Sequence, residues 1–294
     1  MAEKKTNKNN DSVAVAKQSD GTVQITFTID WKEIAAKREE TLKELAKSVE
    51  VAGFRKGKAP VAKAREKLDP QFVLEKTLSQ ILPQMFSAAI KDNGIKPAMY
   101  PKFELVSAEE EKDWQVRATT AEIPEFEFGD YKKAVKNEKS SDIWTPEKGD
   151  PKEQKELTRE QKENIAIVAL QKHFNFQIPK VLIDEEVNSR LASLLERIEK
   201  LGMSLEGYMA SVKKDVETLR KEYSESAEQA IRLDIVLGRI AEEEKITVSD
   251  SDIADFMRVA NAGEPKTVGE EQKNTISAFL IKRKVLDTLA QQVS

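Results

Sequence analysis

The segment TVQITFTID, residues 22–30, decides the fold of the first half of the chain. Every second residue of it is apolar: Val23, Ile25, Phe27 and Ile29. A period of two is typical of a strand with one buried face. Asp30 stands where a helix N-cap is expected, and apolar residues recur at helical spacing over residues 34–46. The segment therefore predicts a strand that leads directly into a helix.

Outward from this segment, the patterns are those of a small mixed domain. Helices are predicted over residues 60–68 and 70–92, and strands over residues 102–106 and 114–121. We expect a small antiparallel sheet with helices on one face, spanning residues 20–135. Residues 1–19 are rich in Lys, Asn and Ser and are predicted to be a disordered tail.

The second half of the chain differs in composition. Residues 136–157 are charged and poor in apolar side chains, with proline and glycine interspersed, which is typical of a linker. Helices are predicted beyond it, over residues 158–174, 182–200, 205–212, 213–244, 250–260 and 268–292. Ser204, Ser249 and Thr267 stand at N-cap positions. We predict an elongated all-α domain over residues 158–294 and an α+β fold for the chain.

Charge and composition exclude several classes of function. The 294 residues include 48 Lys and Arg against 52 Asp and Glu, and the formal net charge of −4 argues against a uniformly basic nucleic-acid-binding protein. Without cysteine, disulfides and thiolate metal sites are excluded. The one histidine, His173, stands among apolar residues near a predicted helix end, where a packed imidazole is expected. We expect no catalytic residue, no metal and no cofactor.

Neither a signal peptide nor a membrane span is indicated. Residues 1–19 lack the apolar core of a signal peptide, and no window approaches the roughly 18 apolar residues of a membrane helix. Acidic runs at residues 109–111 and 242–244 lack the spacing of a calcium-binding loop, so we expect them to be solvated. We predict a cytoplasmic protein with no membrane partner.

Positive charge is concentrated in and after the octet GFRKGKAP, residues 53–60. Residues 53–67 contain six Lys and Arg against one acid, a net charge of +5 in a chain whose total is −4. Gly53 and Gly57 permit backbone conformations that other residues avoid, and Pro60 fixes the entry into a helix. We predict a loop between a strand-like piece and a helix, suited to grip a phosphate-rich surface.

Two interpretations of the octet stay open from the residues alone. In the first, Arg55 forms bidentate phosphate pairs, while Lys56 and Lys58 add point charges. Phe54 would then fill a pocket on a protein or stack on a base. In the second, the octet is a solvated basic tip with Phe54 turned inward.

The octet resembles the signature loop of trigger factor, a family of ribosome-associated chaperones of bacteria. Other stretches are similar to the same family: PEFEFGDY at residues 124–131, IPKVLIDEEV at residues 178–187, and residues 233–244 followed by ITVSD at residues 246–250. Together these matches extend over most of residues 21–293. The octet is the most specific of them, because amphipathic helices resemble one another easily.

The resemblance implies docking beside the exit of the ribosomal tunnel, with the octet on a ribosomal protein and adjacent rRNA. The residues that it marks as ribosome-binding are Gly53, Phe54, Arg55, Lys56, Gly57, Lys58 and Pro60. It implies further that helical arms hold nascent and unfolded polypeptides without ATP, which delays aggregation and premature folding. A role in protein export and a homodimer of the free protein stay open.

The chain departs from the family pattern at one place. Full-length members carry a prolyl isomerase domain between the two parts, whereas here the stretch from Tyr131 to Ile178 holds the charged linker and one helical pattern. Trp144 is its only large aromatic residue before Phe174, so an aromatic pocket on a sheet is not expected. We predict a short form that is not an enzyme. Two alternatives stay open: a prolyl isomerase with a degenerate site, and a plain RNA-binding module.

Overall fold

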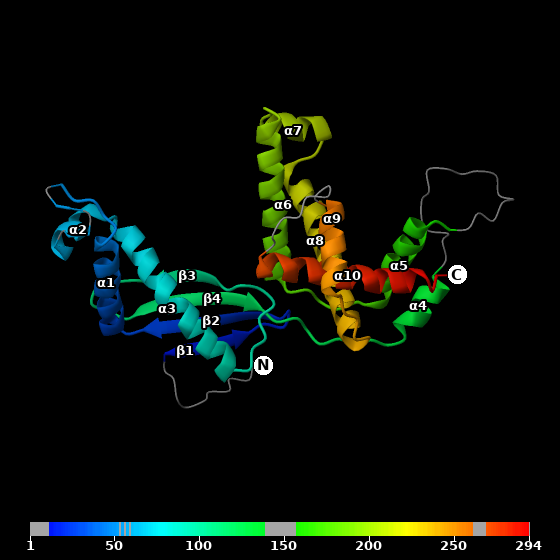
Figure 1. The fold of residues 1–294 in the computed structure, drawn as a ribbon, viewed down its shortest axis with the longest axis horizontal. Coiled ribbons are helices and arrows are strands. Elements are labelled where there is room, and N and C mark those ends of the chain that lie inside the picture. The colour runs from blue at the N-terminus through cyan, green and yellow to red at the C-terminus, as the bar shows by residue number, and fades with distance from the viewer. Residues whose placement is uncertain are drawn as a thin grey trace. The chain divides into compact units, whose positions relative to one another are not determined.

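The computed structural model describes residues 12–52, 54–55, 57–58, 60–138, 157–260 and 269–293. The chain divides into two compact units (Figure 1). The first, here the sheet unit, comprises Met1–Ile123 with Pro179–Val181. The second, here the helical unit, comprises Pro124–Ile178 with Leu182–Ser294.

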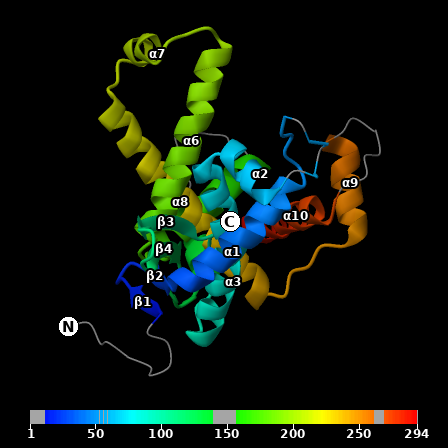
Figure 2. The ribbon, with the colours of Figure 1, turned by 90° about the vertical axis from the view of Figure 1, so that its left-hand side faces the viewer.

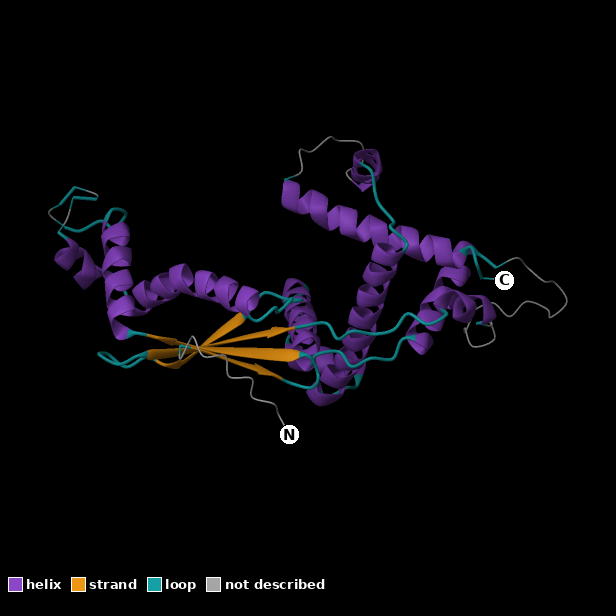
Figure 3. Ribbon diagram, turned by 90° about the horizontal axis from the view of Figure 1, so that it is seen from below, coloured by secondary structure: helices purple, strands orange, loops and turns teal. Residues whose placement is uncertain are grey.

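The sheet unit is built on four antiparallel strands in the order β1-β2-β4-β3. Its elements are β1 (Val13–Lys17), β2 (Thr22–Ile29), α1 (Trp31–Ala46), α2 (Val61–Lys67), α3 (Pro70–Asp92), β3 (Lys102–Ser107) and β4 (Trp114–Ala121). Figure 3 shows the strands in one layer, with helices on one side of it. The predicted small antiparallel sheet with helices on one face is therefore confirmed.

The period of two in β2 produces the core of this unit. Phe27 is fully buried and lies opposite Val116 of β4, so that both strands present apolar side chains to the same face. Ile34 of α1 and Phe86 of α3 belong to the cluster that covers this face. Burial of each such side chain contributes about 1.5–3 kcal/mol. Asp30 caps α1 as predicted, since its carboxylate accepts a hydrogen bond of 2.7 Å from the backbone N–H of Lys32.

The prediction of a disordered tail over residues 1–19 is wrong for β1. This strand pairs with β2 in the register Val15↔Ile25, and Val13 and Val15 pack against the core cluster. Two valines separated by one alanine are too short a pattern to indicate a strand without its partner. Residues 1–11 lie outside the described residues.

The helical unit contains α4 (Tyr131–Asn137), α5 (Arg159–His173), α6 (Lys180–Lys200), α7 (Leu205–Val212), α8 (Val216–Glu243), α9 (Asp250–Ala260) and α10 (Glu270–Ala290), the first residues of α6 belonging to the sheet unit. The predicted helical region is confirmed. Ser204 accepts from the backbone N–H of Gly207, and Ser249 from that of Asp252, as N-caps do. Thr267 lies outside the described residues. None of the helices in the described ranges is long and apolar enough to cross a membrane.

The predicted boundary of the first domain at residue 135 is wrong, because the structure divides the chain after Ile123. The segment that follows Ile123 is extended and packs on α5 and α8. The ring of Phe126 stacks on that of Phe176, with 4.5 Å between the ring centroids, and the Tyr131 hydroxyl donates to Glu244 at 2.9 Å. The alternating phenylalanines of PEFEFGDY thus pack against the core of the helical unit and not against the sheet.

The predicted linker begins later than expected. Helix α4 continues to Asn137, two residues into the predicted linker at residues 136–157, and residues 139–156 lie outside the described residues.

The expected packed role of His173 is confirmed. Its Nε2 lies 2.9 Å from the carbonyl oxygen of Phe128, and its ring meets that of Phe174 edge-to-face. The imidazole fastens the extended segment to α5.

Candidate functional site

The octet lies in the loop between α1 and α2, at one end of the sheet unit (Figure 1). The strand-like piece predicted before it is wrong, since residues 49–52 form a loop that continues from the end of α1. The backbone N–H of Val49 still donates to Leu45, and the Val51 side chain is buried. The apolar residues in this piece therefore anchor a loop instead of extending the sheet.

A tight turn shapes the middle of the octet. The backbone N–H of Lys58 donates to the carbonyl oxygen of Arg55 at 2.9 Å, and Gly57 has a φ of +76° inside this turn. A Cβ atom on Gly57 would lie 2.9 Å from the carbonyl oxygen of Lys47, at the end of α1. Both the backbone angle and the close approach require glycine at this position. The turn is thus held against α1.

The residues around this turn project from the protein. Phe54 is 45% exposed, and Arg55 and Lys58 are exposed as well. Pro60 forms the N-cap of α2, and its carbonyl oxygen accepts from Lys63 and Ala64. Of the predicted ribosome-binding residues, the structure brings together Phe54, Arg55, Gly57, Lys58 and Pro60; Gly53 and Lys56 lie outside the described residues.

The positive charges of this region are largely unpaired. Within the described part of the chain, no ion pair involves Arg55, Lys58, Arg65 or Lys67, and all four side chains are exposed. Lys63 differs, because its Nζ lies 2.9 Å from a carboxylate oxygen of Glu66 within α2. We call Phe54, Arg55, Lys58, Arg65 and Lys67 the basic end. It offers cations and one aromatic ring to a partner.

A second exposed surface lies in the helical unit, where α7 joins α6 to α8. Figure 2 shows α7 at the far end of these two helices. Leu201 is 70% exposed and Val216 is 56% exposed, with Met203 and Leu205 exposed between them in the sequence. We call these four residues the apolar end. The cluster of Leu and Met around the loop before α7 is a signal in the sequence that points to this surface.

No group of three or more His, Cys, Asp or Glu side chains placed to hold a metal ion occurs in the part of the chain that the structure describes. The acidic run at residues 109–111 instead forms the turn before β4. There the Glu109 carbonyl oxygen accepts from the indole N–H of Trp114 at 3.0 Å.

The fold defines a two-unit α+β protein, in which an antiparallel sheet unit with an exposed basic loop precedes a helical unit. Comparison with known families identifies it further. The family model of the bacterial trigger factor protein matches residues 12–152, and that of the trigger factor C-terminus matches residues 151–292. The chain belongs to the trigger factor family.

The sequences of curated relatives agree with this assignment. The chain is 31% identical to trigger factor of Streptococcus gordonii over 121 residues, 41% of this chain and 28% of the relative. It is 34% identical to trigger factor of Streptococcus agalactiae over 108 residues, 37% of this chain and 25% of the relative. The matched stretches thus span about a quarter of the length of these relatives.

The likeness to a solved structure concerns the fold. That structure was reported under the subject of promiscuous substrate recognition in folding and assembly by the trigger factor chaperone. The match has a TM-score of 0.56 at 16% sequence identity and covers 96% of this chain and 100% of the other. The fold is therefore shared, while most side chains differ.

Proposed function

We propose that this protein is a ribosome-associated chaperone that works without ATP and binds nascent or unfolded polypeptides near the tunnel exit. It delays their aggregation and premature folding in the cytoplasm and so assists folding. The basic end docks on a ribosomal protein and adjacent rRNA. The apolar end is one of the surfaces that hold polypeptide segments.

The observation that carries this proposal is the unpaired charge of the basic end. An overall acidic protein is repelled by RNA unless cations gather locally and face outward. Here Arg55 and Lys58 flank a turn that Gly57 holds against α1, so their backbone positions are set before binding. Preorganisation reduces the entropy lost on docking. Phe54 adds an exposed ring that can enter a pocket on a ribosomal protein.

The apolar end fits the second part of the proposal. Leu201, Met203, Leu205 and Val216 are exposed only in part, at 70%, 41%, 40% and 56%, so each contact with a client is small. Several small contacts produce weak, multivalent and reversible binding, which a chaperone without ATP needs in order to release its clients. Methionine adapts to side chains of different shape.

We propose further that the protein lacks prolyl isomerase activity. The two trigger factor models meet at residues 151–152, which leaves no stretch between them for a further domain. The alternative, an isomerase with a degenerate site, predicts faster cis/trans exchange in a proline-containing tetrapeptide. We expect the rate with the protein to equal the uncatalysed rate.

Co-sedimentation with ribosomes tests the docking surface. The variant Arg55→Glu/Lys58→Glu reverses two unpaired charges of the basic end, and we expect binding to weaken by roughly 100-fold or more, since each phosphate contact carries salt-dependent free energy. The matched control is Lys32→Glu/Lys91→Glu, which changes the net charge equally at exposed positions of α1 and α3 outside the basic end.

The outcomes separate the proposal from its rivals. Control binding like that of the unchanged protein, with loss in the Arg55→Glu/Lys58→Glu variant, supports the proposed docking surface. Equal binding of both variants would refute it. If the protein binds protein-free RNA as tightly as ribosomes, with a steep salt dependence, and does not suppress aggregation of an unfolded protein, it is an RNA-binding module instead.

A further inference from the structure

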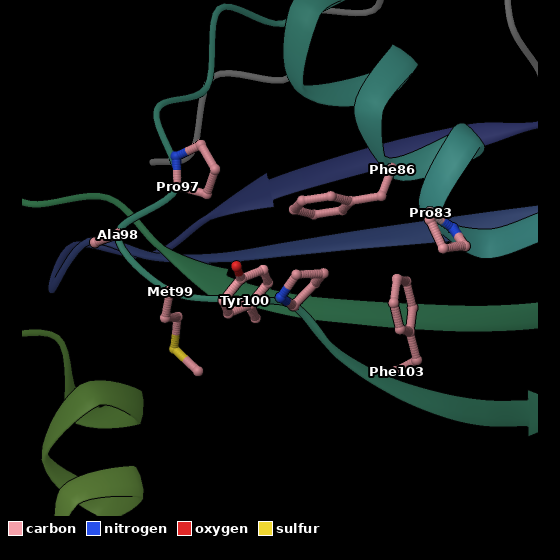
Figure 4. A pocket seen from close by; sticks show the side chains of 8 residues that line it. Pro83, Phe86, Pro97, Ala98, Met99, Tyr100 and Phe103 are labelled. Carbon is pink, nitrogen blue, oxygen red and sulfur yellow. The ribbon is translucent and has the colours of Figure 1, made fainter. Parts of the chain in front are cut away.

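An apolar groove lies in the sheet unit between α3 and the segment that leads into β3 (Figure 4). Its volume is about 650 Å³, which is within the range of sites that hold apolar ligands. The residues that line it are Pro83, Phe86, Pro97, Ala98, Met99, Tyr100, Pro101 and Phe103. Tyr100 is 92% exposed, and the rings of Phe86 and Phe103 meet edge-to-face at 6.2 Å. Aromatic and proline rings thus form the walls.

The groove borders a free edge of the sheet. Strand β3 is the last in the order β1-β2-β4-β3, so within the described ranges of the chain it pairs with β4 on one side alone. Every second residue of β3 therefore directs its backbone N–H and C=O away from the sheet. Such an edge is a template for another extended chain. The register shift between Leu105 and Ser107 ends the regular pairing of β3, and the part of the edge that matters here is Phe103–Leu105.

The side chains of β3 point toward the same face as the groove at alternate positions. Phe103 lies opposite Ala118, and Leu105 lies opposite Val116, and both partners belong to the buried face under the helices. A chain added beside β3 would therefore place every second side chain over the groove. The other edge strand, β1, exposes Ala14 and small or charged neighbours instead. The two edges thus differ in what they offer an incoming strand.

We propose that β3 and the groove together bind an extended apolar segment of an unfolded polypeptide. The segment pairs with β3 as a fifth strand, and its alternate apolar side chains enter the groove. The occupant follows from the chemistry, because open backbone hydrogen-bonding groups require an extended chain and the ring-lined walls require apolar side chains. This inference rests on the proposed chaperone function, to which it adds a client site in the sheet unit.

Fluorescence anisotropy of the full chain, without ribosomes, tests strand pairing. The probe is a short labelled peptide of alternating Leu and Thr residues. Two further peptides carry N-methyl groups, one on the Leu and one on the Thr backbone nitrogens. N-methylation removes the backbone donors and leaves the side chains in place. We expect at least one methylated peptide to bind roughly tenfold more weakly, because the edge contacts alternate N–H groups.

A pair of variants tests the groove. Tyr100→Ala removes a highly exposed ring without touching the buried core, and we expect roughly tenfold weaker binding of the unmethylated peptide. The matched control is Phe72→Ala, which removes another exposed ring of the sheet unit. Phe72 lies on α3, about 20 Å along the helix from Phe86. We expect this control to bind the peptide as the unchanged protein does.

Every outcome bears on the proposal. Equal affinities for all three peptides would overturn strand pairing, and equal affinities of the two ring variants would overturn the groove. If Tyr100→Ala changes self-association of the protein instead, the occupant is a second copy of this chain and the proposal is wrong. Peptide binding as expected, in a protein that does not suppress aggregation, would refute the proposed chaperone function and leave this site intact.

Discussion

The helices of the two units contain similar proportions of charged residues, but the charges are arranged differently. In the helical unit, charged side chains pair within one helix, as in Arg190–Glu186 of α6 and Lys200–Glu196, both at 2.7 Å. At the basic end of the sheet unit, Arg55 and its neighbours form no such pairs among the described residues. Paired surface charges contribute little to stability or to binding. Four cations without an ion-pair partner among the described residues gather within residues 55–67, and this clustering distinguishes the basic end as a candidate docking surface.

Exposed apolar side chains are distributed differently between the basic end and the apolar end. The basic end exposes a single ring, Phe54, whereas the apolar end exposes four aliphatic or thioether side chains. Both units still bury separate clusters of their own, centred on β2 and β4 in one and on α5, α8 and α10 in the other. The buried residues that stabilise each unit therefore differ from the exposed residues proposed to bind partners, so the two sets can be substituted separately.

The largest expected effect is a loss of stability when one ring is removed from the aromatic cluster of the helical unit. Phe174 is 2% exposed, and its ring meets those of Phe126 and Tyr131. We expect Phe174→Ala to lower the free energy of unfolding of this unit by about 3–5 kcal/mol. Urea unfolding followed by circular dichroism at the helix minimum measures it. The exposed Phe279 supplies the control, since Phe279→Ala should change stability little.

Tryptophan fluorescence shows whether Phe174→Ala also destabilises the sheet unit. Trp31 and Trp114 lie in the sheet unit with 6.2 Å between their ring centroids, so a background of Trp144→Phe confines the signal to that unit. We expect the fluorescence transition of Phe174→Ala to stay where it is in the parent. A shift equal to that of the circular dichroism would mean that the two units unfold as one.

The next effect concerns the turn in the octet. Gly57→Ala introduces a Cβ at a φ of +76° and 2.9 Å from the Lys47 carbonyl oxygen, whereas Gly94→Ala introduces one at +61° with open space around it. Both substitutions carry the backbone cost of about 1 kcal/mol, and only the first also displaces the turn. We expect weaker ribosome co-sedimentation for Gly57→Ala alone. Equal co-sedimentation of the two variants would show that the turn geometry is unimportant.

The smallest effect is a dependence of stability on pH in the outer helices of the helical unit. The Lys284 ammonium of α10 donates to Asp252 of α9 at 2.9 Å, and this hydrogen bond, with those from Ser249, lowers the pKa of Asp252 from 3.8 to about 2. Because the folded state favours the carboxylate, the contribution is complete above about pH 4 and is lost as the pH falls toward 2.

Thermal unfolding of Asp252→Asn over this range checks the sign. We expect the variant to unfold at a slightly lower temperature than the parent at neutral pH, and the difference to disappear near pH 2. Asp255→Asn is the control, because Asp255 pairs with Arg258 of the same helix and does not attach α9 to α10. A difference between parent and Asp252→Asn that stays constant with pH would contradict the assignment.

Local patterns predicted most of the elements in this fold. Two kinds of feature depend only on residues that are close in the sequence, and both were predicted correctly. They are the strict alternation in residues 22–29 and the N-cap residues Asp30 and Ser204. β1 was missed because its two valines become informative only beside β2. The phenylalanines of PEFEFGDY were placed in the wrong unit, since alternation indicates an extended chain but not the surface on which it packs.

The candidate site was predictable in part for the same reason. Glycine, proline and clustered cations mark an exposed loop from sequence alone, and the turn at Gly57 agrees with that pattern. The groove was missed, because Pro83 and Phe103 come from separate elements and meet only in the folded sheet unit. The exposure of Leu201 and Val216 was not predicted either, because an apolar residue at helical spacing is normally expected to be buried.

The central claim is that ribosome docking and polypeptide binding belong to different residues. Suppression of the aggregation of a chemically unfolded protein, measured without ribosomes, tests it most directly. We predict that Arg55→Glu/Lys58→Glu suppresses aggregation as well as the parent does, while Leu201→Ser/Val216→Ser suppresses it less. Loss of suppression in the Arg55→Glu/Lys58→Glu variant, with the fold intact by circular dichroism, would contradict the claim.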